Sequence, residues 1–226
     1  MAADQIEGLD AARRQLGDTV LGPREVGAQL GFDPLAVLTP AERSAVARVP
    51  FTPAELERAR ADGELLVLRV PRDPDGPLTM LRLAARLDGG IDPAAHKGSG
   101  YLLRPEWTID DQPFATEETC TAGWWLVRRA PSPATLNKTY AAQDAAIGAA
   151  SANRPRRRSA PEIAYDTLLW HRLHGERLLA AAWDWSRSVS TDQGYAALGE
   201  FGAAGLRVIA YSRAVRFGTL GVCAQR

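Results

Sequence analysis

The stretch from residue 154 to residue 226 constrains the fold more than any other part of the chain. It opens with an Arg-rich segment, and Pro161-Glu162 then begins a predicted long helix that ends near Ala182. The sequence Trp-Asp-Trp-Ser follows at 183–186, and glycines punctuate the chain from there to its last residues. A long helix followed by short strands and turns predicts a small mixed domain at this end of the chain.

The first 119 residues are predicted to form a mainly helical α/β region. Thr-Pro-Ala-Glu occurs at 39–42 and at 52–55, and each copy combines a Thr cap, Pro at the first helical position and Glu in the first turn. Residues 65–70 form a compact apolar run between breakers, which indicates a buried strand. Further helices are expected at 2–16, 25–30 and 78–87, short strands at 101–103 and 106–109, and an exposed acidic segment at 110–118.

A second domain is expected from residue 120 to residue 226. Its first strand, at 123–129, is the strongest strand prediction in the chain because aromatic and β-branched residues come together there. Trp124 and Trp125 must face opposite sides of that strand, so we expect one in the core and one at a domain interface. A helix at 140–150, the long helix, a strand at 206–211 and a final strand at 218–226 complete the prediction.

Composition excludes several classes of protein. The 226 residues include 27 basic and 27 acidic ones, so no global field favours nucleic acid, a membrane or an acidic partner. A hydrophobic fraction of 46% with 24% charged residues is typical of a folded protein. No apolar run reaches about 18 residues, and the N-terminus lacks a signal-peptide core. We therefore expect no membrane span and a cytoplasmic location by default, with a phage-borne or exported product left open.

The order of these pieces along the chain is informative. The residues concerned are Tyr140, Gln143, Arg157, Pro161, Glu162, Tyr165, Gly221, Val222 and Arg226, together with Trp-Asp-Trp-Ser at 183–186. They resemble the Tyr-containing helix, the Arg-Leu-Pro-Thr-Glu helix start, the Trp-Glu-Trp-Thr turn and the closing Gly-Phe-Arg strand of formylglycine-generating-enzyme-like proteins. The resemblance covers about residues 120–226. It implies an α+β, C-type-lectin-like domain with small mixed or antiparallel sheets and two helices.

The whole chain, including Val-Pro-Phe-Thr at 49–52 and the apolar run at 65–70, also resembles the variable proteins of diversity-generating retroelements. Those proteins end in a C-type-lectin-like domain, and a reverse transcriptase rewrites adenine positions in its C-terminal coding segment. The resemblance implies a non-enzymatic ligand-binding or display protein without a cofactor. Its partner would be an unknown protein or surface ligand, bound between Trp183 and Leu220.

Residues 187–217 suit such a face because they mix small, polar and aromatic residues without a steady period. Trp183 and Trp185 before the segment, and Leu220 and Val222 after it, are predicted core anchors, so the segment itself need not supply the core. Ser, Tyr, Gly and Arg suit an adaptable binding surface. The candidate ligand-contacting residues are Arg187, Tyr195, Phe201, Arg207, Tyr211, Arg213, Arg216 and Phe217.

An enzymatic alternative rests on Cys120 and Cys223. The resemblance to formylglycine-generating enzymes implies a copper-binding pair of cysteines, and these two would approach each other if the first and last strands pair. The other reading is that both are small buried hydrophobic residues. His171 and His174, at i,i+3 spacing, are a second alternative as a metal site, against an exposed basic helix turn. We assign no catalytic residue and no metal ligand.

Arg154, Arg156, Arg157 and Arg158 form the densest basic run. Such charge could bind phosphates, but no aromatic residues are interleaved with it, as single-stranded nucleic acid would need. We therefore expect a solvated connection before the long helix, with Arg157 in a structural ion pair, and no nucleic-acid partner. The sequence leaves the oligomeric state open.

Overall fold

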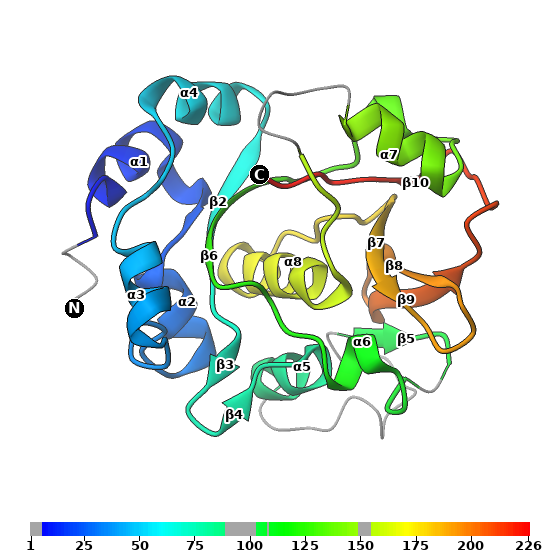
Figure 1. Cartoon of the computed structure of the whole chain (residues 1–226), viewed down its shortest axis with the longest axis horizontal. Helices are drawn as coiled ribbons and strands as arrows, with labels where there is room; N and C mark the ends of the chain where they lie inside the picture. The colour runs from blue at the N-terminus through cyan, green and yellow to red at the C-terminus, as the bar shows by residue number, and fades with distance from the viewer. Residues whose placement is uncertain (1–5, 89–102, 108, 149–154) are drawn as a thin grey trace.

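The computed structural model describes residues 6–88, 103–107, 109–148 and 155–226 (Figure 1). Its helices are α1 (Leu9–Leu16), α2 (Pro23–Leu30), α3 (Pro40–Val46), α4 (Pro53–Ala61), α5 (Met80–Leu87), α6 (Pro113–Thr116), α7 (Tyr140–Gly148) and α8 (Ala160–His174), with 3-10 turns η2 (Gly17–Thr19) and η4 (Pro133–Thr135). Its strands are β1 (Val20–Leu21), β2 (Glu64–Arg69), β3 (Arg72–Asp73), β4 (Gly76–Pro77), β5 (Leu103–Pro105), β6 (Gly123–Arg128), β7 (Trp183–Val189), β8 (Tyr195–Gly202), β9 (Gly205–Tyr211) and β10 (Leu220–Gly221).

A three-stranded sheet, ordered β1-β2-β6, joins the two halves of the chain. β1 is parallel to β2, whereas β6 is antiparallel to it, with Glu64 opposite Arg128 and Arg69 opposite Gly123. All six residues of β2 are buried, as the apolar run between breakers predicted. Because β6 follows residue 119, this sheet crosses the predicted domain boundary.

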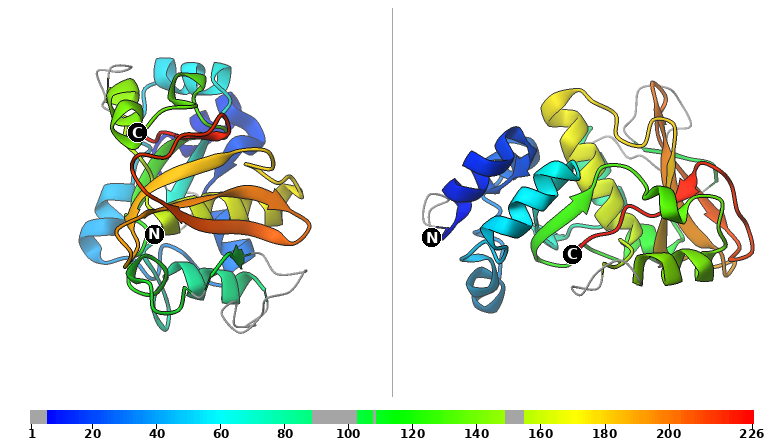
Figure 2. Two further views of the ribbon diagram at one scale, coloured as in Figure 1. Left: turned by 90° about the vertical axis from the view of Figure 1, so that its right-hand side faces the viewer. Right: turned by 90° about the horizontal axis from the view of Figure 1, so that it is seen from above.

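α8 lies at the centre of the molecule, with the N-terminal helices on one side and the larger sheet on the other (Figure 2). Ser159 and Glu162 form a capping box: the Ser159 hydroxyl accepts from the Glu162 N–H, and the Glu162 carboxylate accepts from the Ser159 N–H. Every residue from Ala160 to Trp170 is buried. The helix therefore supplies core residues on all its sides.

The larger sheet has five strands in the order β10-β7-β8-β9-β5. β7, β8 and β9 are consecutive antiparallel strands, while β5 and β10 add parallel edges. The inner face, toward α8, carries Leu198, Phe201, Leu206 and Val208 of the main core. The outer face carries a separate cluster of buried residues that includes Trp183, Trp185, Tyr195 and Ala197.

One hydrophobic core runs through both predicted domains. It contains Leu9 of α1, Leu66 of β2, Leu126 of β6, Ile163 of α8 and Leu198 of β8. The expected boundary at residue 119 therefore does not separate two cores.

The last residues of the chain connect the two sheets. Leu126 and Arg226 exchange backbone hydrogen bonds of 2.9 and 3.0 Å, so the C-terminal segment pairs with β6. Just before it, Leu220 of β10 pairs with Trp183 of β7. The final strand prediction is therefore correct in place, although only Leu220–Gly221 and isolated bridges at Gln225 have strand pairing.

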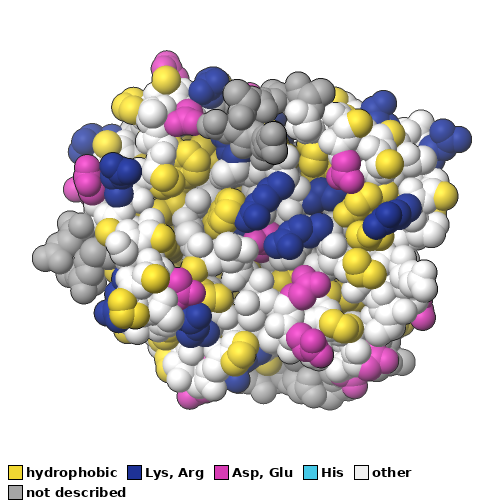
Figure 3. All heavy atoms as spheres, in the orientation of Figure 1, with side chains coloured by type: hydrophobic (Ala, Val, Ile, Leu, Met, Phe, Trp, Pro, Cys, Tyr) yellow, Lys and Arg dark blue, Asp and Glu magenta, His cyan; other side chains and the backbone are white. Residues whose placement is uncertain are grey.

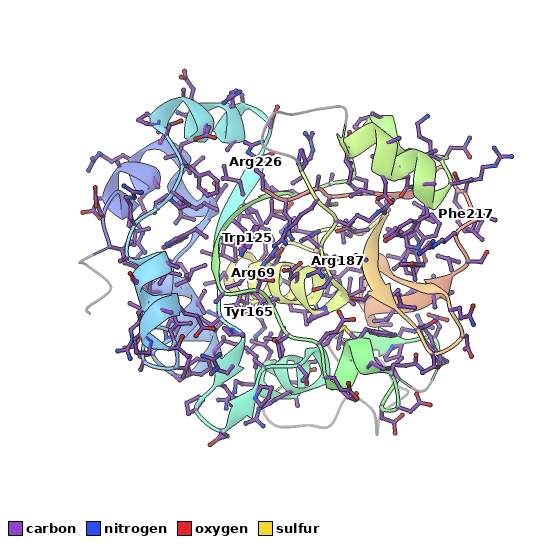
Figure 4. All side chains as sticks on the ribbon, in the orientation of Figure 1. Arg69, Trp125, Tyr165, Arg187, Phe217 and Arg226 are labelled. Carbon is purple, nitrogen blue, oxygen red and sulfur yellow. The ribbon has the colours of Figure 1, made fainter. Side chains whose placement is uncertain are left out.

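A buried chain of ion pairs connects the same elements. Arg69 of β2 donates to Asp166 of α8 at 2.8 Å, and Arg158 donates to the other oxygen of Asp166 at 2.6 Å. Arg158 also donates to Asp184 of β7 at 2.7 Å, and Asp184 accepts from the backbone N–H of Cys223 at 2.8 Å. These charged side chains are 0–3% exposed, and Figure 4 shows Arg69 beside α8.

The α+β class predicted from the sequence is confirmed, with small mixed sheets and helices on both sides of residue 119. Several predicted extents were wrong. The helix predicted at 2–16 begins only at Leu9, and residues 106, 107 and 109 of the strand predicted at 106–109 are not in a strand, since β5 ends at Pro105. The long helix ends at His174, because Gly175 adopts a left-handed conformation with φ of 71°. The acidic segment at 110–118 is not uniformly exposed, since Phe114 of α6 is buried.

Parts of four predicted elements lie outside the described residues: residues 2–5 of the helix at 2–16, residues 101–102 of the strand at 101–103, residue 108 of the strand at 106–109 and residues 149–150 of the helix at 140–150. None of the helices in the described ranges is both long enough and apolar enough to cross a membrane.

Candidate ligand-binding face

The outer face of the β7-β8-β9 sheet has large side chains on its flanking strands and small ones on β8. In one cross-strand row Gly199 lies between Trp183 and Arg207, and in the next Ala197 lies between Trp185 and Ile209. Because β8 contributes so little bulk there, side chains of β7 and β9 approach each other across it. The Arg207 guanidinium lies 5.2 Å from the centre of the Trp183 ring, a cation–π distance.

An aromatic cluster extends from the interior to the surface of this face. It consists of Tyr140, Trp183, Trp185, Tyr195, Tyr211 and Phe217. The Tyr211 ring is edge-on to Trp185 at 6.5 Å and to Phe217 at 5.3 Å, a geometry that aromatic pairs favour. Exposure rises along this series, since Trp185 is 0% exposed and Phe217 is 45% exposed. The cluster is thus anchored in the interior and ends in a ring available to a ligand.

Residues 212–219 form a loop along the rim of this face, and main-chain hydrogen bonds hold it. The backbone N–H of Tyr140 donates to Arg213 O at 3.1 Å, and that of Asn137 donates to Phe217 O at 2.9 Å. Trp183 N donates to Thr219 O at 2.8 Å. Three backbone amides of the flanking elements thus hold the loop whatever side chains it carries at these positions.

The charges of the face differ in how they are compensated. Arg207 donates to Glu106 at 2.7 Å and also contacts Glu200, and its hydrogen bond to Glu106 raises its pKa. Arg213 lies 4.7 Å from the centre of the Tyr195 ring and donates to the Tyr195 hydroxyl. Neither Arg213 nor Arg216 has a carboxylate partner among the described residues. The loop therefore presents two uncompensated positive charges.

Five predicted contact residues belong to this surface: Arg207, Tyr211, Arg213, Arg216 and Phe217. Arg213, Arg216 and Phe217 are exposed, and Arg207 and Tyr211 are half-buried. Burial raises the pKa of Tyr211, and the nearby Arg207 guanidinium opposes that rise. We call the surface formed by these five residues the aromatic–arginine face.

The other three predicted contacts are not part of the aromatic–arginine face. Phe201 is 2% exposed on the inner face of the sheet, in the main core, so its prediction as a ligand contact was wrong. Tyr195 is on the outer face but only 8% exposed, because Tyr140 and Arg213 cover it. Arg187 is exposed but lies near Glu162 of α8 at 3.6 Å, and Figure 4 shows it well apart from Phe217.

Sequence reasoning missed three contributors to this surface. Ile209 and Val215 are partly buried against the aromatic cluster, and Tyr140 covers it from α7. The Tyr140 hydroxyl donates to Ser186 O at 3.1 Å, and burial raises the pKa of Tyr140 to about 12. Alternation in residues 206–211 already places Ile209 beside Arg207 and Tyr211, so that signal was present in the sequence.

The cysteines and histidines considered above as alternative sites do not belong to the aromatic–arginine face. Cys120 and Cys223 are both buried with free thiols, and burial raises the pKa of each well above its usual value. A thiolate is the reactive and metal-binding form, so neither site favours that chemistry. His174 stacks on Trp170 with ring centres 3.9 Å apart, and His171 is edge-on to Phe201. No group of three or more potential metal ligands occurs in the described ranges.

The expectation of a solvated connection was wrong for Arg157 and Arg158, which are 4% and 2% exposed, whereas the predicted ion pair of Arg157 is confirmed, with Asp144 as its partner. Arg157 is buried, donates to Trp185 O at 2.9 Å and to Asp144 at 2.5 Å, and lies 3.8 Å from the Tyr140 ring centre. Arg156 is exposed and stacks on Trp125 at 4.2 Å, whereas Trp124 is buried, as opposite faces of one strand require. Basic side chains also gather near the middle of the face shown in Figure 3. Arg154 lies outside the described residues.

Comparison with protein-family models, curated proteins and solved structures finds no match for this chain.

Proposed function

We propose that this chain is a non-enzymatic ligand-binding protein with a C-type-lectin-like C-terminal region, and that the aromatic–arginine face receives the ligand. The observation that carries this proposal is a contrast within one aromatic cluster: Trp185 at its base, in β7, is 0% exposed, while Phe217 at its end, in the loop at 212–219, is 45% exposed. A rigid buried base with exposed aromatic and Arg side chains is the composition of adaptable binding surfaces.

The charge of the face suggests the chemistry of its ligand. Arg213 and Arg216 lack carboxylate partners in the part of the chain that the structure describes, whereas Arg207 is already paired with Glu106. A protein or surface ligand that combines acidic groups with an apolar or aromatic group would complement this arrangement.

We further propose that a diversity-generating retroelement varies this face. Two features support the proposal: the loop at 212–219 is held by backbone atoms, and Trp183 and Leu220, which bracket the segment, are buried. Neighbouring DNA tests it directly. A reverse-transcriptase gene beside a near-copy of the last coding segment, differing at adenines, is expected; a gene neighbourhood without either would refute the retroelement link.

The display proposal can be tested independently by measuring how well the aromatic–arginine face tolerates substitution. A library that varies Tyr211, Arg213, Arg216 and Phe217 together is expected to yield mostly folded protein, measured as cooperative thermal unfolding of purified clones. A matched library at Leu198, Leu206, Val208 and Trp185 is expected to yield mostly unfolded protein, because those residues are buried. Equal losses in the two libraries would contradict a division between frame and binding face.

A further inference from the structure

Arg156 and Arg187 belong to a second basic surface, where the segment that precedes α8 lies beside β7. Both side chains are exposed. The backbone N–H of Arg187 donates to Arg158 O at 2.9 Å, which ties the two segments together. Figure 4 shows Arg187 and Trp125 near the middle of the molecule and well apart from Phe217. In the same orientation, Figure 3 shows basic side chains near the middle of the face.

The Arg156 guanidinium is held in place without the use of its hydrogen-bond donors. Its Cζ lies 4.2 Å from the centre of the Trp125 ring of β6, a cation–π contact. Its backbone exchanges hydrogen bonds of 2.9 and 3.0 Å with that of Gln225. Among the described residues, the Arg156 side chain has no hydrogen-bond acceptor and no carboxylate partner. Stacking therefore orients the planar fork and leaves its N–H groups free.

Arg187 has only a share in one buried carboxylate. Its Nη2 lies 3.6 Å from Glu162 Oε2, beyond hydrogen-bond distance. That oxygen already accepts from the Ser159 N–H at 2.8 Å and from Gln225 Nε2 at 2.9 Å. Arg69 lies 3.5 Å from the other oxygen. Within the ranges that the structure covers, the Arg187 N–H groups have no hydrogen-bond acceptor either.

The two guanidinium groups border the same buried charges. The Trp125 ring that carries Arg156 lies 5.8 Å from Arg69 Cζ, and Arg69 and Arg187 approach the two oxygens of Glu162. Burial lowers the pKa of Arg156; Glu162 opposes this change, whereas the nearby Arg187 and Arg69 add to it.

The surplus charge of this surface is positive. The side chains that contact one another in sequence alternate in sign: Arg187, Glu162, Arg69, Asp166, Arg158 and Asp184. These three basic and three acidic groups balance, which leaves the charge of Arg156. Glu118 also reaches this region, but its carboxylate accepts from the Ser188 hydroxyl at 2.5 Å and pairs with no Arg of the described residues.

Two exposed guanidinium groups with unused N–H donors suit an oxyanion. A carboxylate has two oxygens, which a single Arg fork can occupy, whereas a phosphate group has three strong acceptor oxygens and can meet two forks at once. We infer that Arg156 and Arg187 bind a phosphate group, carried by a free ion or by an ester. The inference does not depend on the function of the aromatic–arginine face.

Calorimetric titration of the full chain with inorganic phosphate, phosphoserine, serine and acetate tests the inference. Phosphate and phosphoserine are expected to bind, acetate at least about tenfold more weakly, and serine not at all. Tighter binding of phosphoserine than of phosphate would assign the site to an ester, and the reverse order would assign it to the free ion. Failure of both to bind, or binding of acetate as tight as theirs, would overturn the assignment.

Two variants locate the site. Arg156→Gln and Arg187→Gln are each expected to lower the affinity for phosphoserine at least about tenfold. Arg172→Gln is the matched control, because Arg172 is also exposed but lies near the other end of α8. Circular dichroism verifies that each variant is folded. Unchanged affinity in folded Arg156→Gln and Arg187→Gln proteins would refute the site.

The aromatic–arginine face needs its own control because it also carries exposed Arg side chains. A double variant with Arg213→Gln and Arg216→Gln is expected to bind phosphoserine as tightly as the wild-type protein. Loss of phosphoserine binding in that variant, with binding retained in Arg156→Gln, would place the phosphate on the aromatic–arginine face and contradict the inference.

Discussion

Trp185 and Arg216 are expected to contribute very differently to the stability of the C-terminal region. The Trp185 side chain is fully buried between Tyr140 and Tyr211, whereas Arg216 is exposed. Trp185→Ala should lower the free energy of unfolding by about 3–5 kcal/mol, because it empties a large buried volume. Arg216→Ala should change it by less than about 0.5 kcal/mol. Urea denaturation measures both, and similar losses in the two variants would contradict the burial pattern.

Glu162 makes the stability of the folded protein depend on pH. Burial by itself raises the pKa of Glu162, but Arg69, the Ser159 N–H and neighbouring groups outweigh it and lower the pKa to about 2. An unfolded Glu titrates near about 4.3, so this group stabilises the folded state above that pH. The contribution, on the order of 3 kcal/mol, is lost as the pH falls toward 2.

Glu162→Gln removes this titration. Between pH 5 and pH 2 the variant should therefore lose less stability than the wild-type protein, although it starts less stable because Arg69 loses a partner. Urea midpoints measured at several pH values in both proteins check the prediction. Parallel decreases in the two would show that Glu162 does not titrate as described.

At the scale of elements, Gly199 controls how closely β7 and β8 approach. A Cβ atom at Gly199 would lie 2.1 Å from Ala182 O and 2.7 Å from Trp183 Cα, and backbone cannot move aside as a flexible side chain can. Gly199→Ala should therefore destabilise the protein by about 2 kcal/mol or more. Gly218→Ala is the control, since nothing lies within 4 Å of its added Cβ. Thermal unfolding compares them, and a Gly199→Ala protein as stable as the control would disprove the close approach.

The elements that the sequence predicted best are those with local signals. Thr39 and Thr52 begin α3 and α4 through capping boxes that involve only residues three positions away, so these helices could be predicted without tertiary contacts. The alternation in β9 likewise places Arg207 and Tyr211 on the outer face.

The errors in the predicted contact set have two causes. Some strands are paired irregularly, and one predicted contact residue is covered by a side chain that is distant in the sequence. Pairing shifts between Gly199 and Gly202, where Glu200 has φ of 41°, and this bulge turns Phe201 into the core. A second irregularity, between Trp185 and Val189, accompanies the position of Arg187 beside α8. Tyr195 is covered by Tyr140, 55 positions earlier in the chain, and no local pattern indicates that contact.

At the scale of the whole molecule, the buried ion pairs make the N-terminal region part of the C-terminal frame. Arg69 of β2 donates to Asp166 through Nε and Nη2, and through Nη1 to Gln225 near the end of the chain. Tyr165 of α8 donates to Leu68 O at 3.2 Å, and β6 pairs along the whole of β2. The frame behind the aromatic–arginine face is thus completed by residues before position 119.

Residues 120–226 produced alone should therefore fail to form this frame. Without β2 the fragment leaves β6 unpaired on that edge, exposes the side of α8 that contacts β2, and leaves Asp166 without Arg69. Removal of one partner from a buried ion pair costs about 3–5 kcal/mol, a large part of the stability of a small domain. Near-ultraviolet circular dichroism and thermal unfolding of the fragment should show no cooperative transition, whereas the full chain should unfold in a single one. A fragment that melts cooperatively near the temperature of the full chain would instead establish residues 120–226 as an independent domain, with the N-terminal region only packed against it.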